Sequence, residues 1–288
     1  MSLGLNKTKR RINSVKSTKK ITKAMEMVAT VKLKRFRRSY DDDLLYAEKL
    51  EATLAEILSQ FQDDKLPLFA KRNEKAKGRL IIAITSDLGL CAGYNSNLFK
   101  FLDAMLDREN DEIIPLGNKG IAHYSHYMDC HISELASYFA LGMSSGDIVK
   151  GAKALTEAYR NGNYTEILIV STHYVNSLNF EPTSFTLFPI SISYEKKPER
   201  EYRPSLIEPK PSEIVEQMIP QYVTSEIYTK LMESQLCEQG SRRNAMESAN
   251  DNADELLAQL TIEYNKARQS AITQEIVEVV SGASSQTK

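Results

Sequence analysis

The sequence predicts an α/β domain inserted between two long helices that pair with each other as an antiparallel coiled coil. Residues 221–281 contain no proline, and Gly240 is their only glycine. Residues 5–66 contain neither glycine nor proline. Both stretches are rich in strong helix formers. The stretch between them alternates β-branched runs with helical periodicity, which is typical of a sheet covered by helices.

The first long helix is expected over Lys7–Leu58. Its apolar residues recur with a period close to 3.6, most clearly from Leu44 onward. The polar stretch Ser39–Asp43 is either a bend or a solvated part of the helix. Pro67 and the polar run Lys71–Gly78 then predict a loop.

The central part predicts a parallel sheet. Leu80–Thr85 is a continuous apolar and β-branched run, typical of a strand covered on both faces. Strands are expected at 80–85, 112–116, 167–170 and 185–192, and helices at 98–106 and 148–159. Strand, helix and strand in succession favour right-handed parallel crossovers. The last strand is expected to be antiparallel to its neighbour, and Ser144–Asp147 are expected to cap the second helix.

The C-terminal helix follows a charged connector, Glu195–Pro211, that contains four prolines. Ser212 is a candidate N-cap and Pro220 a candidate kink. Sixty helical residues would measure roughly 90 Å, so this helix needs a partner along its length. A heptad-like seam of small and apolar residues supports pairing with the first helix. The expected domains are therefore 1–66, 67–211 and 212–288.

Composition points to an ordinary soluble protein of 288 residues, 42% apolar and 26% charged. No apolar run reaches the roughly 20 residues that a membrane helix needs, and no secretory signal is evident. The three cysteines are far apart and indicate neither disulfides nor a zinc site. Charge is segregated, because the first 38 residues carry thirteen Lys and Arg side chains against one acid, Glu26. Such a basic arm suggests an anionic partner.

Three local patterns are candidate chemical sites. Thr85–Gly93 follows a strand, where phosphate loops occur, but lacks their glycine patterns, so a structural turn is favoured. His123, His126, Cys130 and His131 cluster in sequence without the spacing of a known ligand set, which favours ordinary surface or core residues over a metal site. Ser17–Lys20 matches a Ser-x-x-Lys motif without its companions. No nucleophile, base and acid set emerges.

The basic arm leaves two further alternatives open. It could grip a phosphate backbone, as in a helical scaffold protein that binds nucleic acid. Its charges surround the helix, however, and aromatic residues for base stacking are nearly absent. A plain solvated helix face is the other alternative.

Four blocks of residues resemble the gamma subunit of F-type ATP synthases. Lys20–Ala29 strongly resembles that family's N-terminal signature, and Tyr264–Ile276 with Val279–Ala283 looks like its C-terminal signature. Two shorter blocks also match, in the same order along the chain: Ala245-Met246 with Asp251–Ala253, and Thr85–Asp87 with Gly89-Leu90. Two positions depart from the family pattern, Leu88 where arginine is usual and Arg243 where methionine is usual. They put in doubt any contact that the missing arginine normally makes.

The resemblance implies a central rotor shaft. The two terminal helices would form an antiparallel coiled coil inside a hexamer of alternating alpha and beta subunits. The α/β domain, Rossmann-like but without nucleotide, would sit with the epsilon subunit on the membrane ring of c subunits. The chain would be a non-catalytic subunit of a proton-translocating ATP synthase, without cofactor, metal or nucleic acid, peripheral on the cytoplasmic face of a bacterial cell membrane. A mitochondrial matrix location is less favoured, because no clear transit peptide is present.

The resemblance also assigns contact residues. Arg268, Gln269, Thr273 and Glu275 would meet beta-subunit loops near one end of the shaft, and Met25 and Arg242 would lie at a lower contact with beta. Glu208 would face the c ring. A plain exposed helix face is the alternative for Gln269 and Thr273, and simple coiled-coil packing is the alternative for Met25. The coupling ion, H⁺ or Na⁺, is left open.

Overall fold

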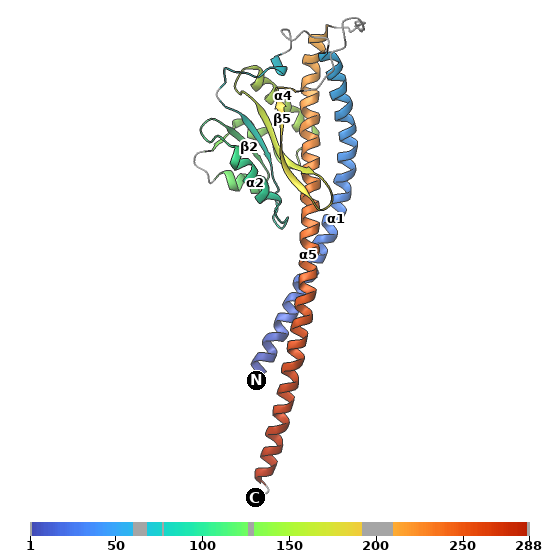
Figure 1. Ribbon diagram of the computed structural model, residues 1–288, viewed down its shortest axis with the longest axis vertical. Helices are drawn as coiled ribbons and strands as arrows, with labels where there is room; N and C mark the ends of the chain where they lie inside the picture. Colours follow the sequence, from blue (N-terminus) through green and yellow to red (C-terminus); the bar gives the residue numbers. More distant parts are fainter. Residues whose placement is uncertain (1, 60–67, 77, 126–129, 192–209, 287–288) are drawn as a thin grey trace. The chain divides into compact units, whose positions relative to one another are not determined.

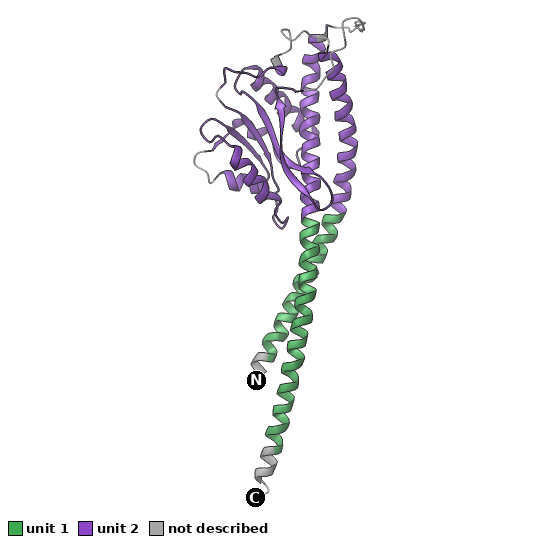
Figure 2. Ribbon diagram, viewed as in Figure 1, with its two compact units in different colours: residues 1–30, 242–288 green, residues 31–241 purple. Residues whose placement is uncertain are grey.

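The computed structural model describes residues 2–59, 68–76, 78–125, 130–191 and 210–286. The chain divides into two compact units, each containing part of both long helices. Residues 1–30 with 242–288 form the first unit, and residues 31–241 form the second (Figure 2). The expected domain boundaries 1–66, 67–211 and 212–288 stay a prediction.

Two long helices open and close the chain (Figure 1). Helix α1 spans Ser2–Leu58 and helix α5 spans Pro211–Gln286. The polar stretch at 39–43 does not interrupt α1, and Pro220 lies within α5, where Thr224 donates a hydrogen bond to its carbonyl at 2.6 Å. The helix begins at Pro211 rather than after Ser212 as expected, because the fixed φ of proline suits the first helical position.

A five-stranded sheet forms the middle of the second unit, in the order β3-β2-β1-β4-β5. The strands are β1 (Leu80–Ile84), β2 (Glu112–Leu116), β3 (His131–Ile132), β4 (Ile167–Tyr174) and β5 (Phe180–Phe188). The first four pair in parallel, and β5 is antiparallel to β4, as the sequence predicts. The fold class expected from the sequence is therefore confirmed.

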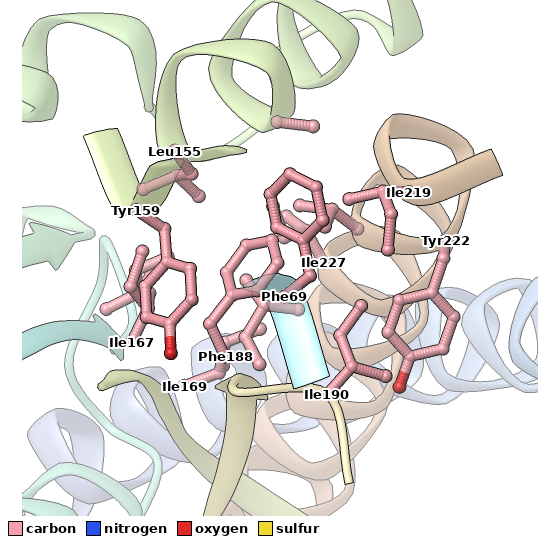
Figure 3. Packing of buried hydrophobic residues seen from close by; sticks show 14 of the residues in the cluster. Phe69, Leu155, Tyr159, Ile167, Ile169, Phe188, Ile190, Ile219, Tyr222 and Ile227 are labelled. Carbon is pink, nitrogen blue, oxygen red and sulfur yellow. The ribbon is translucent and has the colours of Figure 1, made fainter. Parts of the chain in front are cut away.

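Side chains of β1 alternate between two separate cores because successive strand residues point to opposite faces. Ile81 and Ala83 pack toward α2 (Tyr94–Met105), and α3 (Asn118–Tyr124) contributes Tyr124 to the same core. Leu80 and Ile82 face the other core, which α4 (Ser145–Arg160) and both long helices cover. Figure 3 shows this second core, where Phe188, Ile219 and Tyr222 come from the sheet and from α5.

Some local features agree with the sequence prediction and others do not. The cap predicted at α4 is present and takes the form of a capping box, with the Ser144 hydroxyl accepting from the Asp147 amide. Short elements were not expected: η2 (Leu68–Ala70), α3, β3 and η3 (Glu134–Tyr138). They are too short to carry a clear hydrophobic period. Gly240, the one glycine of residues 221–281, lies against Phe180, where a Cβ atom would come within 2.6 Å of the ring.

Candidate partner-binding surfaces of the two long helices

The first unit is an antiparallel pair of helices. Lys19 on α1 bonds to Asp254 on α5 at 2.5 Å, and three residues later on α1 Thr22 bonds to Asn250 at 2.5 Å. The partner number falls as the α1 number rises, which is the signature of antiparallel packing. Among residues 5–30 and 242–280, whose burial is described, the buried apolar residues of this unit are Ala29, Met246 and Leu260. The seam between the two helices contains few buried apolar residues for helices of this length, so polar contacts also contribute to their pairing.

One polar cluster stands at the centre of this seam. The side chain of Asn250 is 5% exposed, accepts from the Thr22 hydroxyl and donates to Glu26 at 2.6 Å. Lys23 also donates to Glu26, at 2.9 and 3.1 Å. The bond from Lys23 is the largest influence lowering the pKa of the Glu26 carboxyl, and that from Asn250 lowers it further. The Glu26 carboxylate therefore stays ionised and accepts hydrogen bonds on both of its oxygens.

Beyond Leu260, α5 is exposed almost all round. Residues 262–280 are exposed except Tyr264 and Ala271, which are half-buried. Large apolar side chains are among the exposed ones: Ile262, Ile272, Ile276, Val277, Val279 and Val280. In the first unit α5 continues past the end where α1 begins (Figure 2). Exposed apolar side chains gathered on one helix segment are typical of a protein–protein contact surface.

Arg268, Gln269, Thr273 and Glu275 all lie on this exposed segment of α5. The Thr273 hydroxyl donates to the backbone carbonyl of Gln269 at 3.0 Å, which links the two residues on one face. Met25 is half-buried and Arg242 is 7% exposed. The structure thus separates the predicted residues into an exposed end and two residues in or near the helix seam. Glu208 lies outside the described residues.

The basic arm is solvent-facing. All thirteen Lys and Arg residues between positions 7 and 38 are exposed except Lys19, which is half-buried beside Asp254. Few of them have acidic neighbours on their own helix, Lys23 with Glu26 and Arg37 with Asp41 being the described pairs. These side chains form a strong positive surface on α1.

The second unit carries an apolar groove of about 640 Å³ between α1, α4 and α5. Its walls include Tyr46, Val149, Pro220 and Tyr228, and Tyr46 and Val149 are 57% and 38% exposed. The carboxylate of Asp43 also lines it, and one of its oxygens is buried without a hydrogen-bond partner. Burial, with a smaller contribution from Asp42, raises the pKa of Asp43. A groove of this kind fits an apolar segment of a partner.

Comparison with known proteins identifies the chain. A family model described as ATP synthase matches residues 4–285. An ATP synthase gamma chain of Fusobacterium nucleatum is 35% identical over 98% of this chain and 99% of its own length. The chain belongs to the ATP synthase gamma-chain family.

One further relative and one solved structure are also similar to this chain. A sodium-ion-specific ATP synthase gamma chain of Acetobacterium woodii is 35% identical, covering 98% of this chain and 99% of that one. A solved mitochondrial ATP synthase of Euglena gracilis contains a chain with a TM-score of 0.66 and 16% identity, covering 99% of this chain and 95% of that one. At that identity the likeness shows the fold alone. The prediction of a gamma-type central-stalk subunit is confirmed by the family, and nothing supports the nucleic-acid scaffold.

The loop at residues 85–93 is a structural turn whose polar groups form hydrogen bonds within the domain. Thr85 donates to the Leu116 carbonyl at 2.6 Å, and the Ser86 amide donates to Asn95 at 3.1 Å. Leu90 and Ala92 adopt positive φ angles of 62° and 46°, a conformation that costs energy in residues other than glycine. This loop presents Leu88 and Leu90, 69% and 63% exposed, to solvent.

The histidine cluster does not assemble as a site among the described residues. His123 stacks on Phe99 with ring centroids 4.0 Å apart, and its Nε2 lies 3.2 Å from Asp103. The described residues contain no group of three His, Cys, Asp or Glu able to hold a metal ion, and His126 lies outside them. In the same described part of the chain, no helix combines the length and apolar character of a membrane span.

Sequence reasoning missed the Asn250 cluster. One signal for it was present, since Glu26 is the single acid among thirteen basic residues. An isolated acid at a seam position points to a specific partner across the seam. The partner itself, Asn250, could not be identified without the register of the two helices.

Proposed function

We propose that this gamma chain is the rotating shaft that couples ion flow through a membrane ring to ATP synthesis and hydrolysis in a hexamer of alpha and beta subunits. The supporting observation is the uncovered apolar end of α5, which carries Arg268, Gln269, Thr273 and Glu275 beside exposed Ile272 and Ile276. Exposed apolar side chains gathered on one helix end are typical of a surface that another protein buries.

The coupling follows from symmetry. A hexamer with three equivalent catalytic interfaces surrounds one shaft, and a single antiparallel helix pair cannot present three equal faces. Each interface therefore meets a different set of shaft side chains. A ligand or partner shifts a conformational equilibrium only by its difference in affinity for the two states, and roughly 5.5 kcal/mol converts a 1:99 population into 99:1. Rotation of the shaft moves these unequal contacts from one interface to the next.

Charged and buried residues have distinct roles in this proposal. The exposed basic residues of α1 would face acidic loops of the beta subunits, where a low-dielectric surrounding strengthens their attraction. Met25 and Arg242 would form a lower contact with beta. Glu208 would face the c ring.

The α/β domain would hold the remaining partners. We infer that the epsilon subunit docks on this domain, with the groove that contains Tyr46 and Val149 as one contact. The chain would then sit peripherally on the cytoplasmic face of the bacterial membrane, attached through the ring. The coupling ion would be the proton, and the sodium-specific relative makes sodium the alternative outcome.

The first experiment is assembly. The chain is expressed with the alpha and beta subunits of its own host and purified through a tag on beta. We expect a complex with three alpha, three beta and one gamma chain that hydrolyses ATP, while the gamma chain alone hydrolyses none. An absence of gamma from the purified hexamer would contradict the proposal.

The second experiment identifies the ion. The complete synthase is placed in vesicles, and ATP-driven uptake is followed with a pH-sensitive dye and with a sodium tracer. We expect acidification of the vesicles without sodium uptake. Sodium uptake that persists when the membrane is made permeable to protons would assign the other ion.

A further inference from the structure

The carboxylate of Glu233 on α5 accepts four hydrogen bonds inside the second unit. The residue is 0% exposed. Its Oε1 accepts from Nδ1 of His173 at 2.5 Å and from the amide of Tyr174 at 3.2 Å. Both donors belong to the end of β4. The same oxygen accepts from the Tyr40 hydroxyl on α1 at 3.3 Å, and Oε2 accepts from Lys230 at 3.1 Å. One side chain thus joins the sheet to both long helices.

The surroundings of Glu233 reinforce this junction. The Arg37 guanidinium of α1 lies over the ring of Tyr174, 4.9 Å from its centroid, while it also bonds Asp41. The ammonium of Lys230 lies 5.3 Å from the centroid of Phe185 on β5. Burial first, and then the charge of Glu233, raise the pKa of the Tyr40 hydroxyl, which therefore stays protonated and able to donate.

Contacts along α5 change in character at this residue. From Val215 to Leu231 its buried apolar side chains belong to the core shared with the sheet, and the polar residues Ser225, Glu226 and Thr229 are buried there as well. After Glu233, where Leu236 is also buried, side-chain hydrogen bonds join α5 to the rest of the unit. Ser234 bonds the Tyr94 hydroxyl at 2.7 Å, the Cys237 thiol donates to the Thr172 carbonyl at 3.4 Å, and Ser241 donates to the Cys91 carbonyl at 2.7 Å.

This change matters mechanically. Apolar burial is non-directional, so it holds two surfaces together without fixing their angle. Hydrogen bonds weaken steeply when their angle changes. A buried charge is also costly, and an apolar residue of similar size is often at least as stabilising. Glu233 therefore contributes more to the orientation of the sheet on the two helices than to the free energy that holds them together.

We propose that Glu233 is a positioning residue that fixes the rotational orientation of the α/β domain on the two long helices, so that torque passes between them without slip. The inference rests on the proposed rotor function. Tight coupling then depends on this buried carboxylate as well as on the exposed end of α5. His173, Tyr40 and Lys230 act as its donors from three directions.

The test uses the complete synthase in vesicles, with ATP hydrolysis and ion uptake measured on the same sample. The variants are Glu233→Gln, which keeps the shape but removes the charge, and Glu233→Leu, which removes all four bonds. Glu216→Gln is the matched control, because Glu216 is exposed on the same helix. We expect Glu233→Leu to retain hydrolysis while ions transported per ATP fall by about half or more, with Glu233→Gln intermediate and the control unchanged.

A role limited to folding gives a different result. It would lower assembly and hydrolysis together and leave the ratio of ions to ATP unchanged, which would overturn the proposal. If Glu233→Leu does not assemble, His173→Ala decides the matter, because His173 is half-exposed and its removal deletes only the shortest of the four bonds. An unchanged ratio in His173→Ala and Glu233→Gln would equally overturn it.

A second readout follows the junction directly. The Tyr174 amide donates to Glu233, so its hydrogen exchange should quicken by about tenfold in Glu233→Leu relative to Glu216→Gln. Failure of the rotor function is distinguishable, because then the unaltered synthase would show no ATP-driven ion uptake. Uptake by the unaltered synthase with an equal ratio in every variant would reject the role of Glu233 alone.

Discussion

The side-chain amide of Asn250 on α5 donates a 2.6 Å hydrogen bond to the carboxylate of Glu26 on α1, and this bond lies inside the helix pair of the first unit. The Thr22 hydroxyl reaches the carbonyl oxygen of the same amide. Both polar atoms of the Asn250 side-chain amide therefore form hydrogen bonds across the seam. A buried polar residue at one seam position favours a single register, because every shifted register leaves its polar atoms unpaired.

Replacement of Asn250 should weaken the helix pair. Asn250→Ala removes the bonds that cross the seam to Thr22 and Glu26 and leaves these two residues only their contacts within α1, and we expect a loss of about 1 kcal/mol. Hydrogen exchange of the α1 amides between residues 19 and 26 measures it. Asn252→Ala is the matched control, since Asn252 is exposed on the same helix. Equal exchange in the two variants would show that the bond contributes nothing to pairing.

Stability should depend on pH through Glu226. Burial, the largest cause, raises the pKa of this carboxyl to about 7, with a further increase from Glu51 and an opposing effect from Lys230. The folded state then binds a proton more tightly than the unfolded state, whose pKa is near the ordinary 4.5. Stability is therefore lost as pH rises from about 4.5 through 7.

The variant Glu226→Gln removes this loss. It should match the unaltered chain at pH 5 and exceed it at pH 8 by on the order of 2–3 kcal/mol. Urea unfolding followed by circular dichroism at both pH values measures the difference, with exposed Glu216→Gln as the control. An equal gain at both pH values would mean that something other than ionisation causes the effect.

The strands and long helices were predictable because each carries a local signal. Leu80–Ile84 is buried throughout, so its run of apolar residues has no polar alternation to confuse it. Helix α1 begins at Ser2 rather than at the expected Lys7, and the boundary of a helix end is the part that a sequence pattern predicts least well. The short elements α3 and β3 carry no such signal. Their conformations depend on the neighbours they pack against.

The junction at Glu233 was not predictable from the sequence for a different reason. Its donors Tyr40 and His173 lie 193 and 60 residues away along the chain. Nothing local at Glu233 distinguishes it from exposed glutamates such as Glu216 on the same helix. Family resemblance, by contrast, predicted the exposed residues at the end of α5, because those positions belong to a recognisable block.

The double variant Gln269→Ala, Thr273→Ala should weaken coupling without unfolding the chain. Both residues are exposed, and the Thr273 hydroxyl bonds only its own helix in the described contacts, so stability should change by no more than about 0.5 kcal/mol. ATP synthesis in reconstituted vesicles should fall. Thr261→Ala tests helix effects alone, because Thr261 makes the same bond within its helix, to Leu257. Normal synthesis by the double variant would remove these residues from the contact.

Met25→Lys should disturb coupling through a new charge. Met25 is half-buried in the free chain, and the proposed contact with beta would desolvate it further. An unpaired ammonium costs energy only in the rotational positions that bury it, so it changes the differences in contact that couple rotation, and we expect ATP-driven pumping to fall more than hydrolysis. Met25→Leu is the control for shape, because it keeps the apolar volume. Pumping that remains normal in Met25→Lys would leave only coiled-coil packing as the role of Met25.

Val149→Lys should release the epsilon subunit if the groove of the second unit is its contact. Val149 is 38% exposed on α4 and lines the groove with Tyr46. A lysine there would bury a charge against an apolar partner surface, which we expect to weaken binding by about tenfold or more. Titration of purified epsilon against the complex of alpha, beta and gamma measures the affinity. Glu157→Lys, which changes the charge on an exposed position of the same helix, should bind epsilon normally. Unchanged affinity in Val149→Lys would place the epsilon contact elsewhere on the α/β domain and leave the groove without a role in it.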